Sequence, residues 1–133
     1  MHLLLILCLA SDLASIKVVP NLERRSELAL ENASAAMDVA RDAASDEVKL
    51  KPALQELRDS VELAYQSLVD SGKSARRNPK FFKKAELKTR ELMRRLEGLA
   101  LAADVDDRVL VESVRERVSK VHDDLIQDIM QKK

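Results

Sequence analysis

The chain has 133 residues and a formal net charge of zero, from 23 basic and 23 acidic side chains. This length fits one domain that buries a sufficient hydrophobic core without stabilising cross-links. The single cysteine, Cys8, excludes an intramolecular disulfide or a cysteine-based zinc site. Two Gly, three Pro and only 2% aromatic residues favour closely packed helices over a β-sandwich.

The N-terminal stretch "MHLLLILCLASDLAS" opens with an apolar run from Leu3 to Ala10. A membrane-spanning helix needs roughly 20 apolar residues, so this run is too short to cross a bilayer. It has the length of the hydrophobic part of a secretory signal and is followed by small residues, although no Lys or Arg precedes it. We predict residues 1–15 as a signal peptide of a secreted or periplasmic protein. An uncleaved apolar segment packed on the domain, or a misassigned start, are the alternatives.

Residues 20–133 contain four stretches in which apolar or small residues recur at spacings of three and four. These are Leu22, Ser26, Ala29, Ala33, Ala36, Ala40 and Ala43; Leu50, Leu54, Leu57, Val61, Ala64 and Leu68; Phe82, Ala85, Thr89, Leu92, Leu96, Leu99 and Ala103; and Val111, Val114, Val118, Val121, Leu125 and Ile129. Such spacing places one stripe on each helix, with a mean period near 3.5. The sequence therefore predicts an all-α domain, an antiparallel up-down-up-down four-helix bundle.

Local signals separate the four helices. Pro20-Asn21 precedes the first, and Pro52 is tolerated only in or near the first turn of the second. Gly72 suits a left-handed residue after the second helix, and Asn78-Pro79 is a good start for the third. The aspartates of residues 103–108 favour the start of the fourth. We expect Gly98 to lie inside the third helix, at a cost of about 1 kcal/mol relative to Ala.

The sequence offers no pattern typical of a catalytic, cofactor or metal site. His122 lacks the Glu three residues before it that di-iron bundles use, and "HDD" at residues 122–124 is interpreted as a solvated helix face. "SGKS" at residues 71–74 lacks the first glycine and the preceding strand of a phosphate-binding loop. We predict a protein that is not an enzyme and has no cofactor.

Charge is distributed unevenly along the chain. Residues 1–72 carry 7 basic and 12 acidic side chains, residues 73–103 carry 10 and 3, and residues 104–133 carry 6 and 8. The corresponding net charges are −5, +7 and −2. The basic part begins with six candidate anion-binding residues: Lys73, Arg76, Arg77, Lys80, Lys83 and Lys84. Lys88, Arg90, Arg94 and Arg95 extend it along the predicted helix.

This cationic segment has two interpretations. It binds an anionic partner, either a lipid headgroup, a cell-wall polyanion or an acidic protein, with nucleic acid as the partner only in the cytosol. Alternatively, the cations pair with acidic residues of neighbouring helices, which contributes about 0–1 kcal/mol a pair. The candidate acidic partners are Glu23, Glu27, Glu31, Asp38 and Asp42, or the aspartates of the fourth helix. Phe81, one position round from the apolar stripe, is expected to be partly exposed.

The segments "RRSELALENASAAMDVARDAA", "SVELAYQSL", "GKSARRNPKFFKKAELKTRELMRRLEGL" and "VHDDLIQDIMQKK" together resemble a group of small, uncharacterised bacterial proteins. The resemblance covers roughly residues 23–133. It implies an exported leader followed by a helical domain and a bacterial source. It supplies no catalytic or ligand-binding residue.

We therefore expect a non-enzymatic, exported helical-bundle protein with a binding or structural role and a cationic surface at residues 73–95. A cytosolic nucleic-acid-binding or regulatory helical module is the first alternative, and a cofactor- or metal-binding bundle is the second. Helices with full-length apolar stripes also allow pairing between chains, so a homo-oligomer is left open.

Overall fold

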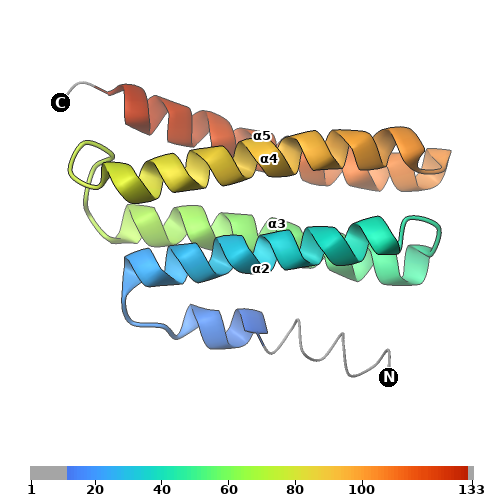
Figure 1. Ribbon diagram of the computed structural model, residues 1–133, viewed down its shortest axis with the longest axis horizontal. Coiled ribbons are helices and arrows are strands. Elements are labelled where there is room, and N and C mark those ends of the chain that lie inside the picture. The colour runs from blue at the N-terminus through green and yellow to red at the C-terminus, as the bar shows by residue number, and fades with distance from the viewer. Residues whose placement is uncertain (1–11, 132–133) are drawn as a thin grey trace.

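A computed structural model describes residues 12–131 of the chain. Four long helices dominate it, α2 (Leu22–Asp42), α3 (Glu47–Asp70), α4 (Pro79–Ala102) and α5 (Val105–Met130), and a short helical segment at residues 12–17 precedes them (Figure 1). Residues 12–131 contain no strand, so the all-α prediction is confirmed. Most of the predicted signal segment, including Leu3–Ala10, lies outside the described residues.

The helix boundaries follow from local chemistry. The Asn21 side chain accepts a hydrogen bond of 2.8 Å from the amide of Arg24, and Asp46 accepts one of 3.1 Å from the amide of Val48. Gly72 has a φ of 71°, the left-handed conformation expected after α3. Pro79 is the first residue of α4, as predicted. Pro52 lies inside α3, close to its start, where its missing N–H leaves only an early turn incomplete.

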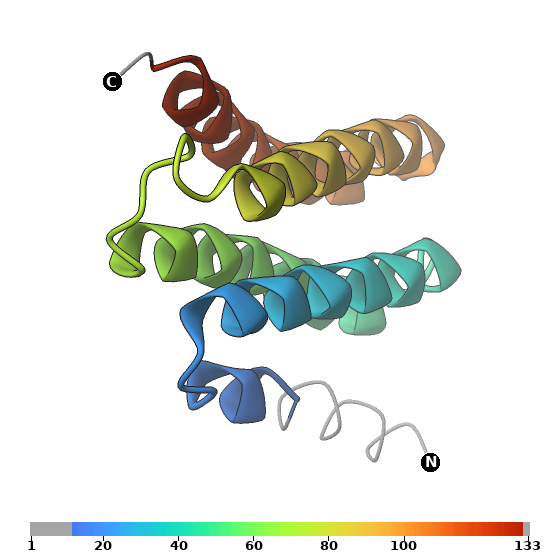
Figure 2. The same ribbon diagram turned by 60° about the vertical axis from the view of Figure 1, so that its left-hand side comes forward.

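The four helices form two hairpins, α2–α3 and α4–α5, with the helices of each hairpin antiparallel (Figures 1 and 2). The hairpins meet where α2 packs beside α4 and α3 beside α5, and the helices of these two pairs run in the same direction. Consecutive helices α3 and α4 lie across the diagonal and touch only sparsely. The connection at residues 71–78 is long enough to cross, since eight extended residues span up to about 26 Å.

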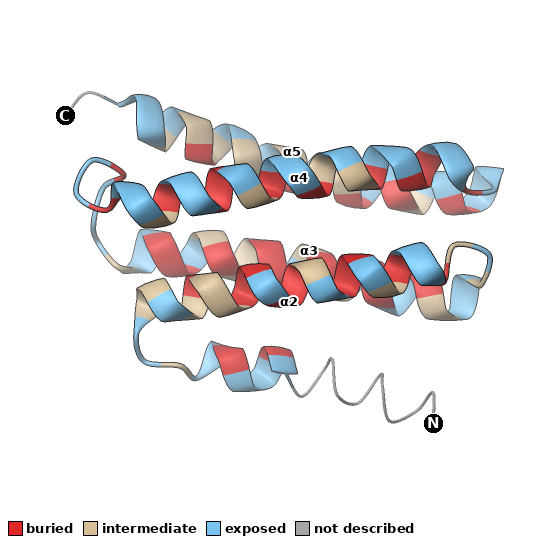
Figure 3. Cartoon of the chain, viewed as in Figure 1, coloured by how far each residue is buried: buried red, intermediate tan, exposed pale blue. Residues whose placement is uncertain are grey.

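The predicted apolar stripes form the core, seen as red stretches on the helices in Figure 3. Half of the buried positions on α2 are alanines, and these four, Ala29, Ala33, Ala36 and Ala40, are fully buried. The α3 stripe opposite them is leucine-rich and equally buried, with Leu54 among its members. Small residues on one helix let larger ones on its neighbour fill the space between two close backbones. Only Ile129, at the end of the fourth stripe, is clearly exposed, at 40%.

The short helical segment at residues 12–17 lies against the α2–α3 hairpin (Figure 1). Leu13 and Ile16 are both buried, and the Arg25 side chain donates a 2.9 Å hydrogen bond from Nε to the carbonyl oxygen of Val19. The contact therefore uses residues on both sides of position 15, the predicted end of the signal segment.

The two glycines differ in backbone conformation, so the same substitution by alanine should change stability in opposite directions at the two positions. Gly98 lies inside α4, and a Cβ added there would meet no atom within 4 Å, so Gly98→Ala should raise the free energy of unfolding by about 0.5–1 kcal/mol. Gly72→Ala should lower it by about 1–2 kcal/mol, because φ is positive there. Urea denaturation followed by circular dichroism measures both. If both substitutions changed the free energy of unfolding equally and in the same direction, these conformational roles of Gly72 and Gly98 would be contradicted.

Candidate functional site

The six candidate anion-binding residues lie in the α3–α4 loop and the first two turns of α4, at the end of the molecule where the chain crosses between hairpins (Figure 1). Ala75 is buried and anchors the loop to the core. The Ser74 carbonyl accepts hydrogen bonds from the amides of Arg77, at 3.1 Å, and Asn78, at 3.0 Å, which closes a turn. The six basic residues are all exposed: Lys73, Arg76, Arg77, Lys80, Lys83 and Lys84.

Two of the six are bound to α2. Lys73 Nζ lies 2.9 Å from Glu23 Oε1, and Lys84 Nζ lies 2.6 Å from Glu27 Oε2. The hydrogen bond from each lysine is the main cause that lowers the pKa of its glutamate partner. For Lys73 and Lys84 the second interpretation, pairing with acidic residues of the first helix, is therefore correct.

The other four cations form a separate group. Among the ion pairs formed by residues 12–131, none includes Arg76, Arg77, Lys80 or Lys83. We call these four residues the free cationic end. Lys80 Nζ lies 5.6 Å from the ring centre of Phe81, which is half-buried, as expected.

The start of α4 adds positive potential to the free cationic end. Its first turn contains no acidic residue, and the Asn78 side chain accepts no capping hydrogen bond. The amides of the first turn and the helix dipole therefore face this region without a negative side chain to balance them. By contrast, the first turns of α2, α3 and α5 all contain Asp or Glu.

Further along α4, most of the predicted cationic surface is neutralised. Arg95 pairs with Asp38 of α2, and Lys88 pairs with Glu91 on its own helix. Arg90 binds Glu86, with Nη2 2.7 Å from a carboxylate oxygen. Arg94 is exposed and belongs to no ion pair of the described residues. The surface proposed for residues 73–95 thus reduces to the free cationic end plus Arg94.

A buried polar cluster between α4 and α5 was not anticipated from the sequence. Glu86 is 5% exposed and lies 3.0 Å from His122 Nε2 as well as beside Arg90. Burial raises the pKa of Glu86, but the hydrogen bonds from His122 and Arg90 outweigh it, so the net pKa is below the ordinary value of 4.5. The interpretation of "HDD" as a solvated face is wrong for His122, whose side chain is only 16% exposed. The spacing of residues within one helix could not indicate this, because Glu86 lies on another.

A second polar contact joins α2 and α3. Asn32 Nδ2 donates a 2.8 Å hydrogen bond to Ser60 Oγ and lies 3.4 Å from Glu56 Oε2. Burial is the largest influence on Glu56 and raises its pKa above the ordinary value. This contact satisfies polar groups inside the hairpin and fixes the register of its two helices.

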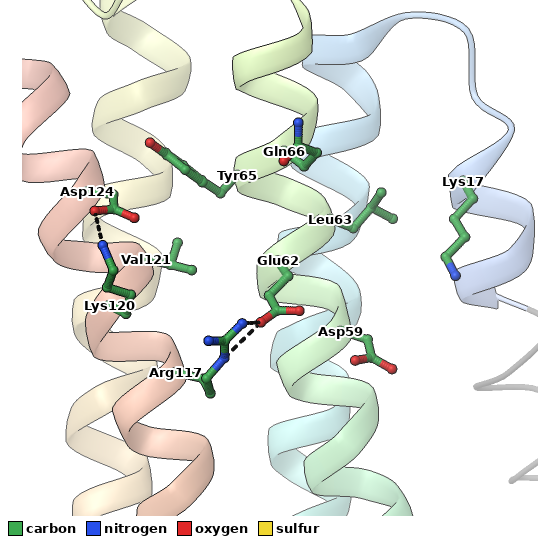
Figure 4. A pocket seen from close by; sticks show the side chains of 10 residues that line it. All are labelled: Lys17, Asp59, Glu62, Leu63, Tyr65, Gln66, Arg117, Lys120, Val121 and Asp124. Atoms are coloured by element: carbon green, nitrogen blue, oxygen red, sulfur yellow. Dashed lines mark hydrogen bonds and ion pairs between the residues drawn. The ribbon is translucent and has the colours of Figure 1, made fainter.

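An open groove of about 750 Å³ lies along the outer side of α3, between α5 and the segment at residues 12–17 (Figure 4). Its six charged lining residues comprise three cations and three anions: Lys17, Arg117, Lys120, Asp59, Glu62 and Asp124. Arg117 pairs with Glu62, and Lys120 Nζ lies 2.7 Å from Asp124 Oδ1. Since the charges balance and four of the six pair with one another, the lining favours neither an anionic nor a cationic ligand.

Residues 12–131 bring together no group of three or more His, Cys, Asp or Glu side chains suited to a metal ion. None of the described helices combines the length and apolarity that crossing a membrane requires.

Comparison with known proteins found no matching family model, no similar curated protein and no similar solved structure. The resemblance to small exported bacterial proteins therefore stays a prediction.

The Glu86 cluster gives a testable dependence of stability on pH. Because the pKa of Glu86 is lower in the folded chain, its charged form stabilises the fold above pH 4.5, and this contribution is lost as the pH falls through the folded pKa. Glu86→Gln should cost about 1–3 kcal/mol in free energy of unfolding at pH 7. The difference from the unsubstituted protein should shrink below pH 4.5.

Glu91→Gln is the matched control, because Glu91 is exposed on the same helix and pairs only with Lys88 among the described residues. It should change the free energy of unfolding by less than about 0.5 kcal/mol at either pH. A Glu86→Gln effect that is equally small, or that does not vary with pH, would refute the stabilising role of the cluster.

Proposed function

We propose that this chain is an exported, non-enzymatic helical-bundle protein that binds an anionic partner through the free cationic end. The observation that carries the proposal is the division of the six predicted residues. Lys73 and Lys84 are used in ion pairs to α2, whereas Arg76, Arg77, Lys80 and Lys83 are exposed without an acidic partner in residues 12–131.

The chemistry of this end suits negatively charged oxygen ligands. Arg76 and Arg77 offer planar guanidinium groups that bind phosphate or carboxylate in a bidentate manner, and Lys80 and Lys83 add mobile point charges. The start of α4 supplies amide groups and the positive end of the helix dipole. The partner classes that fit are anionic lipid headgroups, cell-wall polyanions and acidic proteins.

A binding role is also consistent with the polar chemistry elsewhere. Glu86, Arg90 and His122 bind one another between α4 and α5, an arrangement that holds two helices together. Asn32, Glu56 and Ser60 serve the α2–α3 hairpin in the same way. The polar side chains of these two clusters are therefore engaged in structural contacts, whereas the free cationic end is exposed on the surface.

Replacing Arg76, Arg77, Lys80 and Lys83 by Glu should weaken binding to phosphatidylglycerol-containing vesicles and to polyphosphate by more than about tenfold at low salt. Co-sedimentation and fluorescence anisotropy measure the two affinities. Circular dichroism should show unchanged helicity, since these side chains are exposed and make no ion pairs within the described residues.

The control variant replaces two cations elsewhere on the surface by Glu: Lys51, which is exposed, and Arg115, which is half-exposed. It is compared with the Arg76→Glu/Arg77→Glu double variant. Both double variants change the net charge equally, so only a site-specific effect separates them. If both double variants weaken binding to the vesicles and to polyphosphate equally, the binding depends on net charge and not on the free cationic end. Unchanged binding by the variants of the free cationic end would overturn the proposal.

Export has its own test, the intact mass of the protein recovered from fractions of its native cells. A chain beginning between Ser11 and Ile16 in the envelope or medium is the expected result. A chain beginning at Met1 in the cytosol would contradict export, and nucleic acid would then replace lipid and cell-wall polyanions as the probe to test first.

A further inference from the structure

The α3–α4 connection and the two hairpin turns, at opposite ends of the helix assembly, carry charge of opposite sign. The free cationic end lies where the chain crosses from α3 to α4, and both hairpin turns lie at the opposite end (Figures 1 and 2). The hairpin turns and the helix starts that follow them, residues 43–48 and 103–107, contain five acidic residues and no Lys or Arg. They are Asp46, Glu47, Asp104, Asp106 and Asp107.

Three of these acidic residues are available to a partner. Glu47, Asp104 and Asp106 are exposed, and no ion pair among the described residues includes them. Asp46 is close to Lys49, at 3.9 Å, and Asp107 is buried. We call Glu47, Asp104 and Asp106 the free acidic end.

Two of the cations near the free acidic end, Arg41 and Arg108, are already engaged. Arg41 pairs with Asp38 and Asp42, and the Arg108 side chain turns back to the carbonyl oxygens of Ala100 and Ala103 at the end of α4. Lys51 is exposed one turn further along α3. Apart from Lys51, the unpaired charges near the tips of the two hairpins are thus carboxylates.

Exposed apolar side chains accompany the charges at both ends. Near the free acidic end, Val48, Leu101, Val105 and Val109 are between 69% and 80% exposed. At the cationic end, the last turns of α3 and α5 expose Val69 (47%), Ile129 (40%) and Met130 (71%). Each end therefore offers apolar surface near charged residues, which is the composition of a protein interface with a charged rim. At the cationic end this surface also adjoins two acidic residues, Asp70, which is exposed, and Asp128, whose carboxylate accepts a hydrogen bond from Tyr65.

We propose that the acidic end of a second copy of this chain binds the free cationic end, giving head-to-tail self-association. The inference rests on the proposed anionic partner of the cationic end and names that partner. Charge complementarity between the two ends steers and orients the contact, while the apolar side chains provide area to bury. A net charge of zero imposes no overall repulsion between copies.

This contact is heterologous, because it joins two different surfaces of the same chain. Each copy keeps one free end after pairing, so the contact repeats to form a filament or closes into a ring. Since the charges are exposed, association should weaken as salt shortens the screening length, which is about 10 Å at 0.1 M.

Complementary charge-reversed variants test the pairing of the ends. One variant replaces Arg76, Arg77, Lys80 and Lys83 by Glu, and the other replaces Glu47, Asp104 and Asp106 by Lys. Sedimentation velocity over a wide range of concentration at low salt should show association of the unsubstituted chain. Each variant alone should associate more than about tenfold more weakly, because its two ends now carry the same sign.

An equimolar mixture of the two variants is the decisive sample. Each of its contacts again joins opposite charges, so association should return in the mixture. Failure of the mixture to associate, association that survives in either variant alone, or an unsubstituted chain that remains monomeric at low salt would each overturn the inference. Circular dichroism of both variants establishes that they are folded.

The same variants separate this inference from the proposed function. The Glu47→Lys/Asp104→Lys/Asp106→Lys variant should bind phosphatidylglycerol vesicles and polyphosphate at least as well as the unsubstituted chain, because its cationic end is intact. If it binds these probes but the unsubstituted chain never self-associates, the inference fails and the proposed function stands. If self-association occurs without binding to either probe, the chain itself is the anionic partner.

Discussion

The arrangement of the helices depends on the alanine stripe of α2, which lets neighbouring helices approach its backbone closely. Ala29, Ala33, Ala36 and Ala40 are completely buried, so the α2 backbone packs tightly against its neighbours, and the leucines of α3 fill the space between them. The same helix also packs beside α4, which links the two hairpins. With almost no aromatic residues to fill larger gaps, the core depends on this small-against-large packing.

The position of α2 beside α4 also decides which cations are neutralised. Glu23, Glu27 and Asp38 project from α2 and reach Lys73, Lys84 and Arg95. One partner of each pair is about half exposed, so solvent screens the pairs and each contributes little to stability. Their consequence is electrostatic: they remove positive potential from the side of α4 that faces α2 and leave it at the α3–α4 loop. Lys73 of that loop pairs with Glu23, whereas Arg76 and Arg77 form no ion pair with the described residues.

The alternating direction of the helices gives the molecule its polarity. Both hairpin turns lie at one end, and each is followed by a helix start, where Asp and Glu interact favourably with the helix dipole. α4 begins at the other end with no acidic residue in its first turn. Helix-start chemistry in α3 and α5 thus places acidic residues at one end, and its omission in α4 leaves the free cationic end at the other. The acidic residue in the first turn of α2, Glu23, also lies at the cationic end, where it pairs with Lys73.

The sequence by itself determined the four helices, the apolar stripe that each helix buries and the starts at Asn21 and Asn78, because spacing, the Asn21 cap and a proline at the first position of α4 act within a few residues of one chain segment. It did not indicate that Leu13, Ile16 and Ala75, or polar side chains such as Glu86, are buried as well. It also identified the cationic segment, because charge is a property of composition. Only the tertiary structure decided which helices are neighbours, which of the six cations are paired and that Glu86 meets His122. Each of these depends on contacts between side chains far apart in the sequence, and helical periodicity specifies which face of a helix is buried without specifying the helix that covers it.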